Sequence, residues 1–287
     1  MLTIHFPDLN IYKYFPEHLD ECDEAQYILL SRLAYAQQSG KITFEQFRTL
    51  AVYGLLDIKK SEKELDQETS EEVWANIARL SEYIDNLFII SEDKTQYRLN
   101  TDYLNNKIEK FSHFKTNYYG PADPLNGICF GQWIDAVELV MEHYNQPSDE
   151  TYTRLLAIMF LKRNEEYPTK NIEQFLGKRT KHFKYIDKGI QYGFFMFFTS
   201  FMNYLNSANV EIAGNEIDLS IIFDSTSTSN STLASIGIRS TAYSIAQSGE
   251  FGDYEKVRQM PLGEIMLRLY EMKKAYLDEK QELENNK

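Results

Sequence analysis

A metal site needs clustered His, Cys or carboxylate ligands, and this 287-residue chain has five histidines and two cysteines. The histidines are His5, His18, His113, His143 and His182. No two of them stand at HxxxH or HExxH spacing. His18 and Cys22 are four residues apart and could share a helical face, but two ligands are too few for a zinc site. We therefore expect no metal site and no cofactor.

Nucleophilic catalysis would need an activated serine or cysteine. Cys129 lies between Ile128 and Phe130, which is typical of a small buried hydrophobic side chain. The alternative is a nucleophile paired with His143 or another distant histidine, and no neighbouring residue supports it. No GxSxG elbow occurs. The 43 carboxylates are too many for their spacing to single out a glycosidase-like pair. We expect no catalytic residues, and an enzyme with an unrecognised site remains the alternative.

The segment 175–180, FLGKRT, imitates the end of a phosphate-binding loop. A Walker motif requires a glycine five residues before its final glycine, but that position is Ile172. The phosphate-loop interpretation is therefore rejected. The same region is nevertheless a basic island in an acidic chain. Its basic and aromatic side chains are Lys178, Arg179, Lys181, Phe183, Lys184, Tyr185 and Lys188.

Basic groups interleaved with aromatic rings can bind a nucleic-acid backbone or an acidic protein surface. The alternative is a solvated connector before the next helix. The net charge of the chain is −13, and proteins that grip nucleic acid usually have a basic balance. An acidic protein partner is therefore favoured over nucleic acid.

The last helix is the second candidate for partner binding. An apolar stripe follows its helical period through Leu262, Ile265, Met266, Leu269, Met272 and Tyr276. Such a stripe can be buried within its own domain or can dock into a partner. The expected contact residues here are Leu262, Ile265, Leu269 and Met272.

Helical patterns dominate the chain. N-terminal capping signals stand at Asp23, Thr43, Thr69 and Ser148. Asp253 or Pro261 is expected to begin the last helices. Further helices are expected over 131–144 and 171–176, with a helical segment at 102–111. Alternating patterns predict hairpins over 87–99 and 210–223. The expected fold is mainly α, or α+β with two small β-hairpins, and contains no parallel sheet.

Two domains are expected, 1–118 and 119–287. The stretch 118–133, YYGPADPLNGICFGQW, concentrates glycine, proline and turn-forming residues, which favours a joint between them. We expect Cys129 to be buried there, and Tyr118 and Tyr119 could face a partner. The Phe-rich run 189–208 is interrupted by polar residues, so a buried core helix is favoured over a membrane span. No signal-peptide pattern opens the chain.

Three segments resemble proteins from the tail and virion gene clusters of tailed bacteriophages and prophages. They are ICFGQWIDAVELV (128–140) with YTRLLAIMFLKR (152–163), the Phe-rich block ending in FMNYL, and FGDYEKVRQMPLGEIMLRLYEMKK (251–274). Such proteins often carry a TFGQ(F/W)ID helix start, an LLAILYR-like helix and a terminal MPL element. Here Cys129 replaces the usual threonine, and 160–163 departs from the tyrosine-arginine ending.

The resemblance implies a virion component of the tail region or a tail-assembly factor, such as a chaperone for the tape-measure protein, and no catalytic residues. We expect a non-enzymatic protein that binds other phage structural or assembly proteins, in the bacterial cytoplasm or the virion. It could form a homo-oligomer, and no membrane association is expected. The alternative is a nucleic-acid-associated protein of a mobile element that uses residues 178–188.

Overall fold

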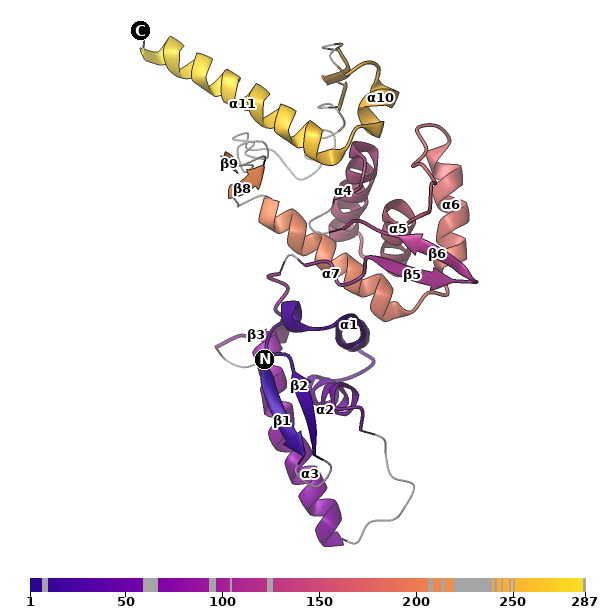
Figure 1. Cartoon of the computed structure of the whole chain (residues 1–287), viewed down its shortest axis with the longest axis vertical. Coiled ribbons are helices and arrows are strands. Elements are labelled where there is room, and N and C mark those ends of the chain that lie inside the picture. The colour runs from indigo at the N-terminus through magenta and orange to yellow at the C-terminus, as the bar shows by residue number, and fades with distance from the viewer. Residues whose placement is uncertain are drawn as a thin grey trace. The chain divides into compact units, whose positions relative to one another are not determined.

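The computed structural model shows two compact units (Figure 1). Unit 1 comprises Met1–Ile108 with Ile186–Phe197, and unit 2 comprises Glu109–Tyr185 with Phe198–Lys287. The structure describes residues 1–6, 10–58, 67–92, 97–103, 105–122, 126–205, 209–212, 215–218, 239, 242–243, 245–247, 249 and 251–285. The expected mainly α fold is confirmed, and every strand pairing among these residues is antiparallel.

Unit 1 is built from helices and two small hairpins. Its elements are β1 (Leu2–Phe6), β2 (Ile11–Phe15), η2 (Leu19–Glu21), α1 (Glu24–Gln38), α2 (Phe44–Leu55), α3 (Gln67–Glu82), η3 (Tyr83–Leu87), β3 (Phe88–Ile90) and β4 (Tyr97–Leu99). Asp23 and Thr43 cap α1 and α2 as expected. The expected start of α3 at Thr69 is wrong, because the helix already includes Gln67, whose side chain donates to Glu71 one turn later.

The first part of α7 (Lys188–Leu205) belongs to unit 1 and packs against α1. Asp187 caps this helix, because its Oδ1 accepts the Gly189 N–H at 2.6 Å. The buried Tyr27 hydroxyl donates to the carbonyl oxygen of Gly193 at 2.6 Å. A Cβ at Gly193 would lie 2.8 Å from Ser31 Oγ, so glycine permits this approach of the two helices.

Unit 2 contains the remaining elements. They are β5 (Lys110–His113), β6 (Thr116–Tyr119), α4 (Phe130–Asn145), α5 (Asp149–Met159), β7 (Leu161–Lys162), α6 (Ile172–Phe183), the rest of α7, β8 (Asn209–Ile212), β9 (Asn215–Asp218), α10 (Tyr254–Gln259) and α11 (Leu262–Asn285). Ser148 caps α5 as expected. Asp253 caps α10, and α11 begins directly after Pro261, so each of the two expected starts precedes a helix. The strands β8 and β9 form the expected second hairpin, and the polar segment 224–232 lies outside the described residues.

The helical segment expected at 102–111 is wrong, because the described residues of 102–109 form no helix and a hairpin strand begins at Lys110. Strands β5 and β6 pair with His113 opposite Thr116, and Tyr118 pairs in turn with Lys162 of β7. The Phe111 ring lies 4.9 Å from Phe160 and 5.3 Å from Phe183, between ring centroids. Packing on these distant residues places the hairpin in unit 2, so the observed division differs from the expected one at 118/119.

An ion pair with little exposure to solvent joins α10 to α4. Arg258 Nη2 lies 2.6 Å from Asp135 Oδ2, and the two side chains are 4% and 9% exposed. The Tyr167 hydroxyl donates to the same Asp135 oxygen at 2.7 Å. Burial acts to lower the pKa of Arg258, but Asp135 outweighs it, so the pKa of the guanidinium is raised. These contacts hold the start of α11 against α4, where Leu262 N–H donates to the Ile128 carbonyl at 3.1 Å.

The Phe-rich helix α7 is interrupted by polar residues, as the sequence indicates. Gln191 is fully buried, and its side-chain amide donates to the Ile186 carbonyl at 2.7 Å. Among the described residues, no helix combines the length and the apolar character that crossing a bilayer requires.

Candidate partner-binding site

Helix α6 carries the basic island. The helix was expected to end at Leu176 but continues to Phe183, because Leu176, Thr180 and Phe183 form a buried side at helical spacing. The opposite side is exposed. It carries Lys178 and Lys181, and the exposed Lys184 and Tyr185 follow directly. We call these four residues the α6 face.

Two of the expected contact residues are not available to a partner. Arg179 is buried and donates to Phe160 O at 2.9 Å and to Glu165 Oε1 at 2.6 Å. Its guanidinium also lies 4.5 Å from the centroid of the Phe175 ring. Phe183 is fully buried and packs edge-on against Tyr118. The expectation that Arg179 and Phe183 bind a partner is therefore wrong, because both side chains hold α6 onto unit 2.

The tyrosine pair and the last helix were also expected to contact a partner, and some of these residues are buried while others are exposed. Tyr118 is buried and Tyr119 is exposed. On α11, Leu262 and Ile265 are buried, Leu269 is half-buried and Met272 is exposed. The expectation therefore fails for Tyr118, Leu262 and Ile265. These three side chains are buried in the core of unit 2.

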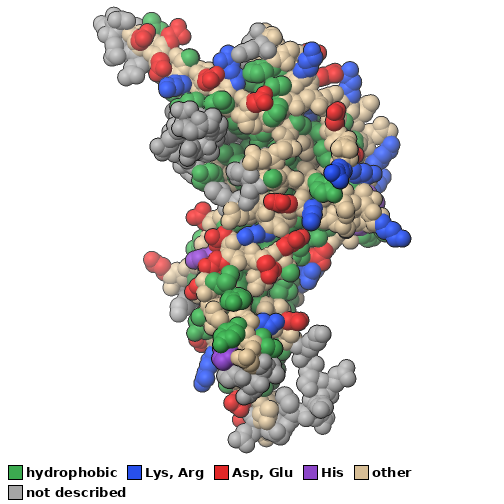
Figure 2. Space-filling view, in the orientation of Figure 1, with side chains coloured by type: hydrophobic (Ala, Val, Ile, Leu, Met, Phe, Trp, Pro, Cys, Tyr) green, Lys and Arg blue, Asp and Glu red, His purple; other side chains and the backbone are tan. Residues whose placement is uncertain are grey.

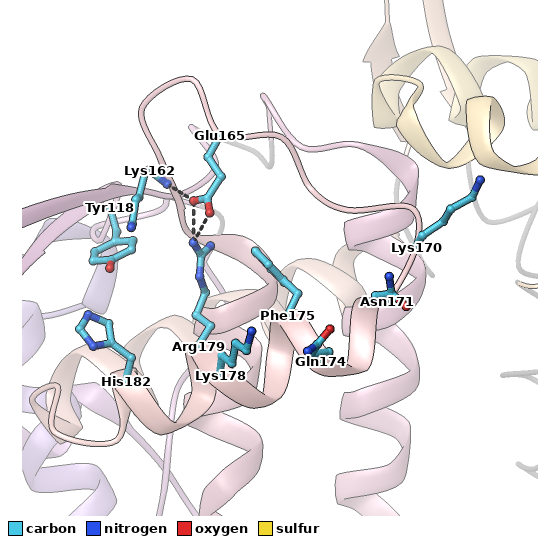
Figure 3. A pocket seen from close by; sticks show the side chains of 10 residues that line it. All are labelled: Tyr118, Lys162, Glu165, Lys170, Asn171, Gln174, Phe175, Lys178, Arg179 and His182. Atoms are coloured by element: carbon cyan, nitrogen blue, oxygen red, sulfur yellow. Dashed lines mark hydrogen bonds and ion pairs between the residues drawn. The ribbon is translucent and has the colours of Figure 1, made fainter.

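A cleft of about 530 Å³ lies along α6 (Figure 3). Its lining residues are Tyr118, Lys162, Glu165, Lys170, Asn171, Gln174, Phe175, Lys178, Arg179 and His182. Glu165 is the only acidic residue of this lining, and Arg179 and the Lys162 backbone N–H both bind it (Figure 3). Lys162 and Lys170 were not identified from the sequence. Lys162 reaches the cleft only because β7 pairs beside it, and Lys170 directly precedes the N-cap of α6.

Positive charge is concentrated here. Residues 151–185 include eight Lys or Arg and three Asp or Glu, whereas the other residues of the chain include 22 and 40. Figure 2 shows Lys and Arg side chains gathered over the edge of unit 2 that carries α6. Burial, together with the nearby His113, Lys162 and Arg179, lowers the pKa of His182. The neutral form of His182 is therefore favoured, first by burial and then by the neighbouring cations.

The tip of the β5–β6 hairpin lies beside the last turn of α6. His113 Nε2 donates to the His182 carbonyl oxygen at 2.9 Å, and the Phe114 ring lies 5.5 Å from the His182 ring. Phe114 and Lys115 form the two-residue turn, and both have positive φ, at 45° and 58°. The Phe114 side chain is 71% exposed. We call Phe114 and Lys115 the hairpin tip.

The side chains considered for metal binding and catalysis are not brought together at one site within the described part of the chain. Among the described residues, no three His, Cys, Asp or Glu side chains lie close enough to hold a metal ion. His143 is buried, its Nδ1 lies 3.2 Å from Thr151 Oγ1, and burial lowers its pKa. Cys129 is half-buried, so the expectation of a buried side chain is wrong, although burial still raises the pKa of its thiol.

A second cleft of about 520 Å³ adjoins the first and shares Lys162 and Glu165 with it. Neither lining contains His143 or Cys129, and Glu165 is the one carboxylate in each. Comparison of the chain with protein-family models, with curated proteins and with solved structures finds no match. The resemblance to tail and virion proteins of bacteriophages therefore remains a prediction.

Proposed function

We propose that this chain is a non-catalytic protein of a tailed bacteriophage or prophage that acts by binding other protein chains. It serves as a virion component of the tail region or as a tail-assembly factor. The observation that carries this proposal is the α6 face, a group of exposed lysines in a chain of net charge −13. Its counterpart is an acidic surface on another structural or assembly protein.

The lysines of the α6 face are available for such a contact. None of Lys178, Lys181 and Lys184 forms an ion pair within the part of the chain that the structure describes. A local positive surface steers an acidic partner and selects its orientation, and this effect weakens as salt screens the charges. The α6 helix is itself fixed by Arg179 and Phe183, so the lysines project from a rigid support.

The structural use of the candidate acid–base groups supports a non-catalytic role. General acid–base catalysis uses positioned groups within hydrogen-bond reach of one site. Glu165 is the single carboxylate in the lining of the two clefts described above. Its carboxylate is already bound by the Arg179 guanidinium. His143 and Asp135 are hydrogen-bonded within the packing of α4, α5 and α10. An enzyme with an unrecognised site remains the alternative.

The test is capture of individually purified proteins encoded by the genes that flank this one. We compare the wild type with the variant Lys178→Glu/Lys181→Glu/Lys184→Glu, here called the α6 variant. A matched control, Lys41→Glu/Arg79→Glu/Arg98→Glu, changes three exposed cations of unit 1. We expect the α6 variant alone to lose at least one partner. Capture that is equal for all three chains, or absent for the wild type, would refute the proposal.

Nucleic acid is the second candidate ligand, and the exposed aromatic rings near the lysines favour it. Tyr185 is 76% exposed, and exposed rings beside basic groups can stack on bases. A gel shift with single-stranded DNA at low salt tests this function. A shift that disappears in Lys181→Glu/Lys184→Glu would support it, and the absence of any shift would exclude it.

A further inference from the structure

Unit 2 carries a second exposed surface whose charge is opposite to that of the α6 face. In the sequence, residues 276–285 include four acidic residues and one basic residue. Of the side chains that the structure describes there, Asp278, Glu279 and Glu282 are exposed. Tyr276 and Leu283 of this segment are 59% and 60% exposed. Figure 2 shows Asp and Glu side chains toward the free end of the helix. We call residues 276–285 the acidic end of α11.

The acidic end of α11 is held away from the rest of unit 2. Leu262 and Ile265 are buried at the start of the helix, and hydrogen bonds join Leu262 to Ile128 and Met260 to Phe130. From this anchor the 24-residue helix extends about 36 Å. In Figure 1 it leads away from α6. The side chains that the structure describes in the acidic end, both carboxylate and apolar, are therefore exposed to solvent.

The hairpin tip extends the α6 face with features that complement the acidic end. Lys115 adds a cation, and Phe114 adds an exposed ring beside His182, three residues before Tyr185. Two-residue hairpin turns with positive φ usually contain glycine or asparagine, because other side chains are strained there. Phe114 contacts the rings of His113 and His182, yet most of its side chain remains exposed. Strained positions of this kind often serve binding.

We propose that the acidic end of α11 in one copy of the chain docks onto the α6 face and hairpin tip of a second copy. Asp278, Glu279 and Glu282 lie against the lysines. Tyr276 and Leu283 pack on the rings of Phe114 and Tyr185. This inference rests on the proposed function, because it identifies one partner of the same α6 face.

Each copy contributes a different surface to this contact, so the contact is heterologous. A heterologous contact leaves one free surface of each kind on every dimer, and further copies add to form a ring or an open chain. Exposed ion pairs supply much of the attraction, and they are screened within about 10 Å at 0.1 M salt. Association is therefore strongest at low ionic strength.

Complementary charge reversal tests the geometry. The α6 variant is compared with an α11 variant, Asp278→Lys/Glu279→Lys/Glu282→Lys, by sedimentation velocity of the full chain at low salt. We expect the wild type to associate and each variant alone to be monomeric. Mixing the two variants restores association, because each retains a surface that complements the other. The unit 1 control, Lys41→Glu/Arg79→Glu/Arg98→Glu, associates like the wild type.

Three outcomes would overturn this inference. The wild type could stay monomeric at about 100 μM, a concentration at which even a weak contact of this kind would be populated. The α6 variant could associate alone, which would indicate a symmetric contact between two α11 helices. The mixture of variants could stay monomeric while circular dichroism shows both to be folded. In each case capture of flanking-gene proteins by the wild type, lost in the α6 variant, would leave the proposed function standing.

Discussion

Arg179 Nη2 lies 2.6 Å from Glu165 Oε1, and this ion pair joins α6 to the loop that follows β7. The guanidinium also donates to the Phe160 carbonyl at the end of α5. Burial acts to raise the pKa of Glu165, but the hydrogen bonds and charge of Arg179 outweigh it and lower this pKa. The pair therefore fixes the helix from which the neighbouring lysines project.

Replacing Arg179 is expected to destabilise unit 2. Arg179→Leu leaves the Glu165 carboxylate without its cation and the Phe160 carbonyl without this donor. We expect the free energy of unfolding to fall by about 3 kcal/mol, which is typical of breaking a largely buried pair. Urea denaturation followed by circular dichroism measures the loss. Lys178→Leu is the control, with an expected change within about 0.5 kcal/mol. Equal effects of the two substitutions would contradict the structural role of Arg179.

Replacing either of two glycines by alanine is expected to change the stability of the protein, in opposite directions for the two positions. A Cβ at Gly189 would lie 2.2 Å from the backbone oxygen of Ile28, so Gly189→Ala forces α7 away from α1. We expect its melting temperature to fall by several degrees. A Cβ at Gly177 in α6 would meet no described neighbour within 4 Å, so Gly177→Ala stabilises the helix by about 0.5–1 kcal/mol. Thermal unfolding of both variants checks the pair. Stabilisation by Gly189→Ala would show that the helices are not in close contact.

His143 is expected to make the protein less stable in mild acid. Burial lowers its pKa in the folded chain below the ordinary value of about 6.5. The unfolded chain then binds more protons between these two pKa values, so stability increases with pH. The contribution is complete above pH about 6.5 and is lost as the pH falls through the lower pKa of the folded chain. Urea denaturation from pH 7.5 to 5 measures this slope, which should be shallower in His143→Gln. Histidine NMR titration would contradict the argument if His143 titrated above 6.5.

The two thiols are expected to be poorly reactive in the folded chain. Burial raises the pKa of Cys22 to about 12 and also raises that of Cys129, so little thiolate is present at pH 8. A chromogenic disulfide reagent should modify both cysteines slowly, and Cys22 more slowly than the half-buried Cys129. Unfolding in urea should restore rapid reaction at both. In the variant Cys129→Ser, Cys22 is the remaining thiol. Rapid modification of Cys22 in the folded variant would contradict the burial of this side chain.

Helix starts were the features most readily predicted from the sequence. Asp23 and Thr43 were identified as caps, and in the structure each accepts the backbone N–H three residues later. These hydrogen bonds span one turn, so their partners are visible in a short window of residues. Thr69 failed as a start because a capping pattern can also occur inside a helix.

The β5–β6 hairpin could not be predicted in the same way. Phe111 was assigned to a helical segment, yet its ring packs on Phe160 and Phe183, which are distant in the sequence. The turn contains Phe114 and Lys115 rather than the glycine or asparagine that usually marks it. Without that local signal, the hairpin could be found only from its contacts with residues distant in the sequence.

The candidate site was also predictable in part from the sequence and in part only from the tertiary structure. Its basic and aromatic composition was evident in the sequence, since residues 178–185 need no partner to be recognised as a charged island. The sequence could not separate Lys178 from Arg179, which are adjacent and carry the same charge. Tertiary packing turns Arg179 toward Glu165 and Phe160, and leaves Lys178 in solvent. Local hydrogen bonding thus determined where the helices begin, whereas burial by sequence-distant neighbours decided which charges remain free to bind.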